Sequence, residues 1–221
     1  MRLAGEFRSI RLSNPIVLAI PRGGVVTGYV LAREIGAELD IVVSRKIGSP
    51  GQPELAIGAV MHDGTVFINE EVANYTGASR DYIEEETKNQ IDEAKRRLEV
   101  YRGNRDYPEL EGRSVIIVDD GVATGATMIT AIRWVKGQGA REVIAATPVA
   151  PIETFVILKK EAGMAVCPKL PEPFFAIGQF YDEFPATADE EVVELLRESR
   201  EESRDKHEKQ VNRSENLTSS S

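Results

Sequence analysis

Two adjacent carboxylates, Asp119 and Asp120, are the residues of this chain whose type and spacing point most directly to chemistry. A turn rich in glycine and threonine, residues 121–127, follows them at once. A turn of this composition before a helix aims backbone N–H groups and the positive end of the helix dipole at one point, which suits a phosphate. The acids would repel a phosphate, but they can accept hydrogen bonds from sugar hydroxyls or approach a metal. The pattern therefore predicts a site for a sugar phosphate.

The elements on either side of these residues explain how they are positioned. Residues 115–118 are four apolar β-formers, which indicates a buried parallel strand. After the turn, apolar residues recur at helical spacing, namely Met128, Ile129, Ile132 and Val135. We therefore expect a strand–turn–helix unit with both acids at the end of the strand.

A second unit of the same kind lies near the start of the chain. The apolar residues 16–20 predict a strand, and Arg22, Gly23 and Gly24 follow it before a helix that ends at Gly36. Two successive glycines let backbone N–H groups approach a ligand closely, and Arg22 adds a positive charge. The alternative is an ordinary tight turn with a surface arginine.

A third group of candidates surrounds a stretch rich in glycine and proline. Residues 40–44 predict a strand that ends at Arg45 and Lys46, and residues 47–54 predict a mobile surface loop. Such a loop can close over a reactive intermediate and exclude water. Arg45 and Lys46 could hold phosphate oxygens, with Glu54 at the other base of the loop; the alternative is a solvated strand end and an ordinary surface acid.

The rest of the chain alternates between strands and helices. Asp63-Gly64 predicts a hairpin turn with His62 exposed beside it, and Ser79 is expected to cap a long packing helix that ends near Tyr101. Further strands are predicted at 143–149 and 164–167, a helix starting at Pro151, and a short last helix from Asp189. This order is typical of an α/β fold with a doubly wound, mostly parallel sheet and a flanking β-hairpin. Both glycine turns then lie at the carboxyl edge of the sheet, where ligands bind.

One segment departs from this alternation. Five of the fourteen aromatic residues lie within residues 174–184, which predicts a small aromatic hood or flap. Flat aromatic faces can sandwich a planar base, and Phe175 is the candidate for that contact. A subunit contact and a small core beneath a loop are the alternatives.

Composition limits the classes of protein. With 221 residues we expect one domain over residues 1–196, followed by a polar, disordered tail at 197–221. The net charge of −9 argues against a general nucleic-acid binder, and no apolar run is long enough to cross a membrane. Cys167 is alone, so no disulfide is expected, and the predicted location is the cytoplasm.

The stretch 115–128 resembles the phosphoribosyl-pyrophosphate (PRPP) motif of the type I phosphoribosyltransferases: apolar residues, two acids, a short link and then Thr-Gly-x-Thr. The likeness extends from about residue 16 to 189. The segments 21–24, 45–48, 53–60 and 173–175 are similar to one branch, the predicted phosphoribosyltransferases with no assigned base. Members of the family often have a non-proline cis peptide in the loop that corresponds to 21–24.

The resemblance implies a reaction and a set of roles. A nitrogen nucleophile would displace pyrophosphate from C1 of PRPP, with Mg²⁺ bound mainly through ligand oxygens and no protein metal site. Asp119 and Asp120 would hold the ribose hydroxyls. The 5-phosphate would be wrapped by Ala123, Thr124, Gly125, Ala126 and Thr127, and the pyrophosphate would be held by Arg22, Gly23, Gly24 and Lys46, with Arg45 beside them.

The chain departs from the hypoxanthine–guanine branch at Ala123, where that branch has a third acid near the purine. Glu54 is the only acid between Lys46 and Ala56, so it is our candidate for the group near the base. The expected partners are PRPP and an unidentified base, in a homodimer, without nucleic acid or membrane. The alternatives are a regulatory protein that binds PRPP or a nucleotide without catalysis, and a phosphoribosyl hydrolase.

Overall fold

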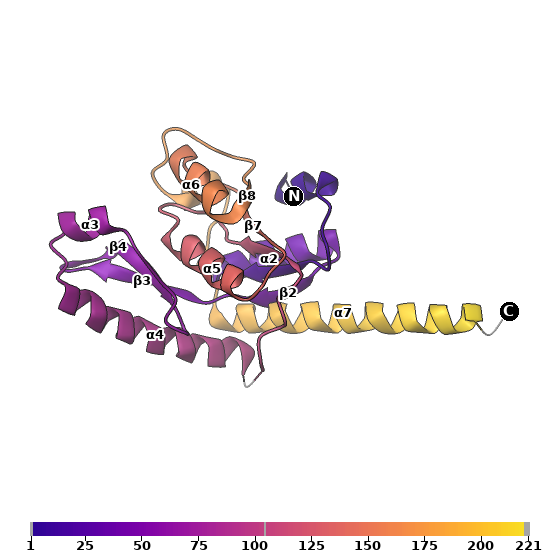
Figure 1. Ribbon diagram of the computed structural model, residues 1–221. Helices are drawn as coiled ribbons and strands as arrows, with labels where there is room; N and C mark the ends of the chain where they lie inside the picture. Colours follow the sequence, from indigo (N-terminus) through magenta and orange to yellow (C-terminus); the bar gives the residue numbers. More distant parts are fainter. Residues whose placement is uncertain (1, 104, 219–221) are drawn as a thin grey trace.

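The computed structural model of the chain describes residues 2–103 and 105–218, and its centre is a sheet of five parallel strands (Figure 1). The strands lie in the order β2-β1-β6-β7-β8, and their bounds are Ile16–Ala19 for β1, Glu38–Ile41 for β2, Ser114–Val118 for β6, Glu142–Ala146 for β7 and Gly163–Val166 for β8. Every residue of β1 and β6 is buried, as a strand covered on both faces requires. The predicted doubly wound parallel sheet is confirmed.

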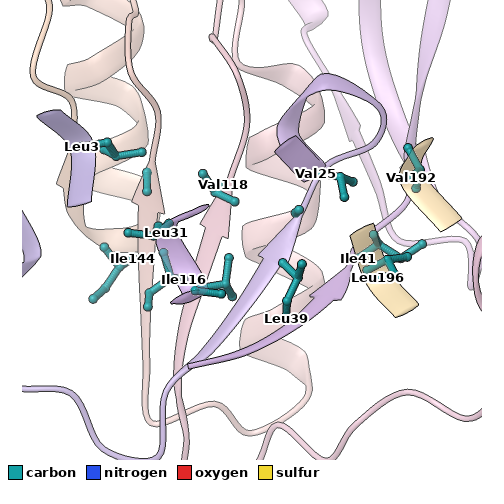
Figure 2. Packing of buried hydrophobic residues seen from close by; sticks show 14 of the residues in the cluster. Leu3, Val25, Leu31, Leu39, Ile41, Ile116, Val118, Ile144, Val192 and Leu196 are labelled. Atoms are coloured by element: carbon teal, nitrogen blue, oxygen red, sulfur yellow. The ribbon is translucent and has the colours of Figure 1, made fainter. Parts of the chain in front are cut away.

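Helices cover both faces of this sheet because its side chains alternate between them. Val17 and Ile116 point to the face covered by α1 (Arg2–Glu6), α2 (Gly23–Ile35), α7 (Asp189–Thr218) and part of α4 (Arg80–Arg102). Ile16 and Ile117 point to the opposite face, which α5 (Ala126–Gly137) and α6 (Ile152–Ala162) cover. Figure 2 shows the first of these cores, where Val192 and Leu196 of α7 reach Ile41 of the edge strand.

A second sheet corrects two of our expectations. Strands β3 (Ser44–Ser49), β4 (Gln52–Met61) and β5 (Val66–Ile68) form an antiparallel sheet in the order β3-β4-β5, so the flanking hairpin has a third strand. The predicted loop at 47–54 is mostly strand, and Arg45 and Lys46 lie within β3 rather than at the end of a parallel strand. Gly48, one of the residues that suggested a loop, fits the hairpin instead: a β-carbon there would lie 2.7 Å from the carbonyl oxygen of Pro53.

Two helices follow this sheet. The short α3 (Glu70–Tyr75) is capped by Asn69, and α4 begins after Ser79, whose hydroxyl accepts a hydrogen bond from the Tyr82 N–H at 3.2 Å. Helix α4 runs beneath β3 and β4 and ends near α7 (Figure 1). Two 3-10 segments, η1 (Phe7–Ser9) and η2 (Ile177–Phe180), complete the described elements.

The end of the chain differs from the prediction. Helix α7 begins at Asp189 as expected but is not short: it continues through the stretch predicted to be disordered as far as Thr218, and its far end extends away from the sheet (Figure 1). Arg197 pairs with Glu194 at 2.6 Å and with Glu201 at 2.9 Å, the spacings that favour a helix. Tyr29 of α2 also donates to Glu198. None of the described helices is long and apolar enough to cross a membrane.

Candidate functional site

Asp119 and Asp120 follow β6 at the carboxyl edge of the sheet. The Asp119 N–H donates to the carbonyl of Ala146, which continues the pairing of β6 with β7 by one residue. The Asp119 carboxylate then turns back and accepts the N–H of Asp120 at 2.9 Å. The parallel sheet therefore places both carboxylates at the edge where ligands of such folds bind.

The two glycines after β1 pack directly against these carboxylates. A β-carbon on Gly23 would lie 1.8 Å from Oδ2 of Asp120, and one on Gly24 would lie 3.0 Å from Oδ1 of Asp119. The peptide between Pro21 and Arg22 is cis, as in many members of the family that the sequence resembles. The prediction that the two turns meet at one edge is confirmed. Glycine is required at both positions because the carboxylates occupy the space that a β-carbon would need.

The turn at 121–125 is fixed by the start of α6. The Thr154 hydroxyl donates to the Ala123 carbonyl at 2.6 Å, and the Val122 N–H donates to the Val149 carbonyl. Gly125, in the left-handed region at φ 81°, precedes the first turn of α5. Ala123 and Thr124 are exposed, and the N–H groups in the first turn of α5 have no helical acceptors, an arrangement that suits an anion.

A cavity of about 560 Å³ lies beside the carboxylates. It brings together five of the predicted site residues from four parts of the chain: Arg45, Lys46, Glu54, Asp119 and Thr127. The Ser44 hydroxyl donates to the Thr127 carbonyl at 3.1 Å and so ties β3 to α5. Asp120, Gly23 and Gly24 lie beside Asp119, and residues 123–126 lead into Thr127. Arg22 is half exposed and forms a 3.7 Å ion pair with Asp189.

The carboxylates are held in an environment that disfavours their charge. Burial first, and then the charge of Asp120, raise the pKa of Asp119 well above its usual value; the N–H of Asp120 and the ammonium of Lys46 oppose this shift. Burial also raises the pKa of Asp120. A cation, or a ligand that donates hydrogen bonds, would stabilise the charged form of these buried carboxylates.

Sequence reasoning missed one wall of the cavity. Helix α4, which we interpreted as a packing helix, contributes Tyr82, Glu86, Gln90 and Arg97. These positions are four, four and seven residues apart, so they share one helix face. That spacing was visible as a polar stripe, but only the second sheet shows that the stripe faces a cavity rather than solvent.

The aromatic flap reaches the site through other residues than predicted. Phe175 is 81% exposed and does not line the cavity, so the structure gives no support for a stacking role. Instead, Ile177 lies so close to Gly121 that a β-carbon there would be 2.3 Å from it, and the Tyr181 hydroxyl donates to the Asp120 carbonyl. Burial and the two carboxylates raise the pKa of Tyr181 to about 12, so this hydroxyl keeps its proton at neutral pH.

His62 lies in the predicted turn but is only partly exposed. Its ring stacks on Tyr107 at 5.4 Å and meets the edge of Trp134 at 5.7 Å, away from the cavity. Within residues 2–103 and 105–218, no group of three or more His, Cys, Asp or Glu side chains could by itself hold a metal.

Comparison with known families accounts for this arrangement. Residues 2–178 match the model of the phosphoribosyl transferase domain. The chain belongs to this family. A candidate phosphoribosyl transferase of Mycobacterium tuberculosis (strain H37Rv) is 39% identical over 195 residues, which cover 88% of this chain and 44% of that protein. A protein of the strain CDC 1551 matches to the same extent. The present phosphoribosyltransferase domain thus spans less than half the length of these relatives.

A solved structure is similar over nearly its whole length. The crystal structure of TT1426 from Thermus thermophilus is 41% identical, with a TM-score of 0.74, and the match covers 88% of this chain and 92% of that one. The phosphoribosyltransferase fold that the resemblance implied is therefore shown by the family match, and the arrangement of the sheet agrees with it.

Proposed function

We propose that this phosphoribosyltransferase-domain protein transfers the phosphoribosyl group of PRPP to a nitrogenous base or related amine and releases pyrophosphate, a reaction of nucleotide salvage. The observation that carries the proposal is the contact of Gly23 and Gly24 with Asp120 and Asp119. It joins an anion-binding turn to a pair of carboxylates at one edge of the sheet. PRPP has a diol between a phosphate and a pyrophosphate. This order matches the site, in which the carboxylates lie between the two anion-binding turns.

Each part of the site has a role in this reaction. Asp119 and Asp120 accept hydrogen bonds from the ribose hydroxyls. The 5-phosphate is bound by the turn at 123–127, where backbone N–H groups and the helix dipole of α5 favour an anion. The pyrophosphate is bound by the N–H groups of the loop at 22–24 and by the side chains of Arg45 and Lys46, which line the cavity beside Asp119.

Magnesium fits the donor set of the site. The described residues offer two adjacent carboxylates and no complete cage, and Mg²⁺ is usually held by one or two carboxylates together with phosphate oxygens and water. Asp119 and Asp120 are the residues that would contact the ion directly or through water. When bound, Mg²⁺ neutralises charge on the pyrophosphate as it departs.

The chemical step exchanges one bond at C1 of the ribose for another. The bond to the pyrophosphate oxygen breaks, and its electron pair leaves with the pyrophosphate. The acceptor nitrogen forms the new bond and releases its proton. Positive charge develops on the ribose, so the nearby carboxylates stabilise the transition state. Glu54, exposed on β4 and lining the same cavity, is our candidate for the group that receives the proton.

Calorimetry with Mg²⁺ and PRPP tests the common premise, since absence of binding would exclude every function based on PRPP. Incubating PRPP with a panel of purines, pyrimidines and small amines, and assaying pyrophosphate, then identifies the acceptor. Binding without pyrophosphate release with any acceptor would indicate a regulatory protein. Release without an acceptor would indicate a hydrolase.

Glu54→Gln separates the two stages of the reaction. The carboxamide has nearly the same shape but cannot take up the proton, so turnover should fall by about 100-fold, a typical share for a general base. The dissociation constant of PRPP should stay the same. Unchanged turnover with the correct acceptor would remove this role from Glu54, while the proposal for PRPP would stand on the binding result.

We also infer a homodimer in the cytoplasm. The support for the dimer is a set of exposed apolar residues on α6: Ile152 at 52%, Val156 at 60% and Ile157 at 46%. The support for the location is the single cysteine, since oxidising compartments favour disulfide pairs. Light scattering of the purified chain would decide the first inference and fractionation of cells the second.

A further inference from the structure

The polar face of α4 contains a chain of hydrogen bonds that ends at the candidate pyrophosphate ligand Arg45. Gln90 donates through Nε2 to Glu86 at 2.8 Å and accepts through Oε1 from Nε of Arg45 at 3.1 Å. All three residues line the cavity beside Asp119. A link therefore runs from the helix to the strand across the wall of the candidate site.

The chemistry of these groups allows only one orientation of the amide. A carboxylate can only accept a hydrogen bond and a guanidinium can only donate. Gln90 must therefore present its NH₂ group to Glu86 and its oxygen to Arg45. Glutamate in place of Gln90 would repel Glu86, and a hydrocarbon would bind neither partner, so the amide is the group that satisfies both neighbours.

The link leaves the terminal nitrogens of Arg45 available. Among the described residues, Nε of Arg45 bonds to Gln90, while its two terminal nitrogens have no hydrogen bond and no carboxylate within 4.0 Å. The side chain is half-buried, and its burial together with the charge of Arg97 lowers the pKa of Arg45. Among the described residues, the Arg45 guanidinium therefore has no anionic partner in an ion pair. The planar fork of its terminal nitrogens matches a phosphate group.

We propose that Gln90, oriented by Glu86, is a positioning residue that aims the guanidinium of Arg45 at the pyrophosphate of PRPP. This inference rests on the proposed function. Gln90 does not itself touch the substrate: it holds Nε, so that the rotation of the guanidinium is set before the anion arrives. Pre-orientation of this kind lowers the entropy lost on binding and improves affinity.

Gln90→Leu tests the inference with pyrophosphate and Mg²⁺ as the probe. Leucine is close in size but makes neither hydrogen bond, so the dissociation constant of pyrophosphate should rise about tenfold, the scale of one hydrogen bond to a charged group. Asn89→Leu is the matched control, because Asn89 is an exposed amide on the same helix and does not line the cavity. It should leave the dissociation constant unchanged.

A double-mutant cycle with Arg45→Ala distinguishes positioning from a general structural role. If Gln90 acts through Arg45, Gln90→Leu should change the pyrophosphate affinity by less than about twofold when Arg45 is already alanine. A persistent tenfold effect in that background, or no effect of Gln90→Leu in the unaltered chain, would overturn the inference. If Gln90→Leu fails to fold, Glu86→Gln replaces it, because a second amide removes the fixed acceptor and should weaken pyrophosphate binding in the same direction.

The unaltered chain separates this inference from the proposed function. If it binds neither pyrophosphate nor PRPP with Mg²⁺, the proposed function fails and the inference fails with it. If it binds both ligands and Gln90→Leu binds them equally well, only the role of Gln90 is overturned.

Discussion

Gly23 lies against the carboxylate of Asp120 so closely that a β-carbon there would fall 1.8 Å from Oδ2. This contact joins the turn after β1 to the turn after β6, although the two residues are far apart in the sequence. The site therefore depends on a position where no side chain can be added without displacing a carboxylate or the loop that faces it.

Gly23→Ala should displace Asp120. We expect a loss of about 1–3 kcal/mol in the free energy of unfolding, the usual scale of overpacking, and a loss of PRPP binding by calorimetry. Gly5→Ala is the control, because a β-carbon on Gly5 meets no atom within 4 Å and its helix should be unchanged or slightly more stable.

A second substitution shows whether the collision is the cause. Asp120→Ala removes the atoms that the new methyl group meets, so the double variant Gly23→Ala/Asp120→Ala should regain most of the lost stability without regaining PRPP binding. If Gly23→Ala and the double variant were equally stable, the collision with Asp120 would not be the cause of the lost stability.

Asp119→Asn should change the dependence of stability on pH. The pKa of Asp119 is raised in the folded state, so between the unfolded value near 3.8 and the raised value the folded chain binds more protons than the unfolded chain. The free energy of unfolding of the unaltered protein therefore falls as pH rises through this window, and it does not recover above it. Asparagine resembles the protonated acid and does not suffer this loss.

We accordingly expect Asp119→Asn to be more stable than the unaltered chain at pH 7 without ligand, by about 1 kcal/mol, the usual size of a single stabilising substitution. The gain should disappear below the unfolded pKa, near pH 3.8. Denaturant titrations across pH measure it, with Asp92→Asn on the exposed side of α4 as the control. A variant less stable than the unaltered chain at pH 7 would contradict the predicted direction.

Thr154→Val should loosen the turn that is proposed to bind the 5-phosphate. Valine retains the shape but loses the hydrogen bond from the hydroxyl to the Ala123 carbonyl, which should lower the free energy of unfolding by about 1 kcal/mol. The Michaelis constant for PRPP should rise about tenfold with little change in turnover. Thr76→Val removes a comparable bond at the end of α3 and should lower stability alone; equal kinetic effects of the two variants would exclude a local cause.

Tyr181→Phe should release the flap at 174–184. The hydroxyl donates to the Asp120 carbonyl, and loss of a bond worth about 1 kcal/mol should raise the hydrogen-exchange rate of the flap amides about fivefold. Tyr75→Phe is the control, because Tyr75 is 89% exposed. Unchanged exchange in the flap would mean that Ile177 and its neighbours hold the segment without Tyr181.

Local sequence determined the parallel sheet and the two turns that define the site. Strands such as 115–118 are short apolar runs that only a sheet covered on both faces buries, and the glycines and threonines specify the turns that follow. The edge on which Asp119, Asp120, Gly23 and Gly24 meet follows from parallel pairing alone, so the order of strands and turns along the chain was enough to predict it.

Tertiary structure decided what long-range pairing controls. Residues 47–54 have the composition of a loop, but strand pairing satisfies their backbone groups and places Arg45 and Lys46 within β3. The polar stripe of α4 had the appearance of a solvated face until the second sheet placed Gln90 against Arg45. The stretch after Asp189 became a long helix through local ion pairs and its contact with α2. Composition describes single residues, whereas these outcomes depend on which distant groups become neighbours.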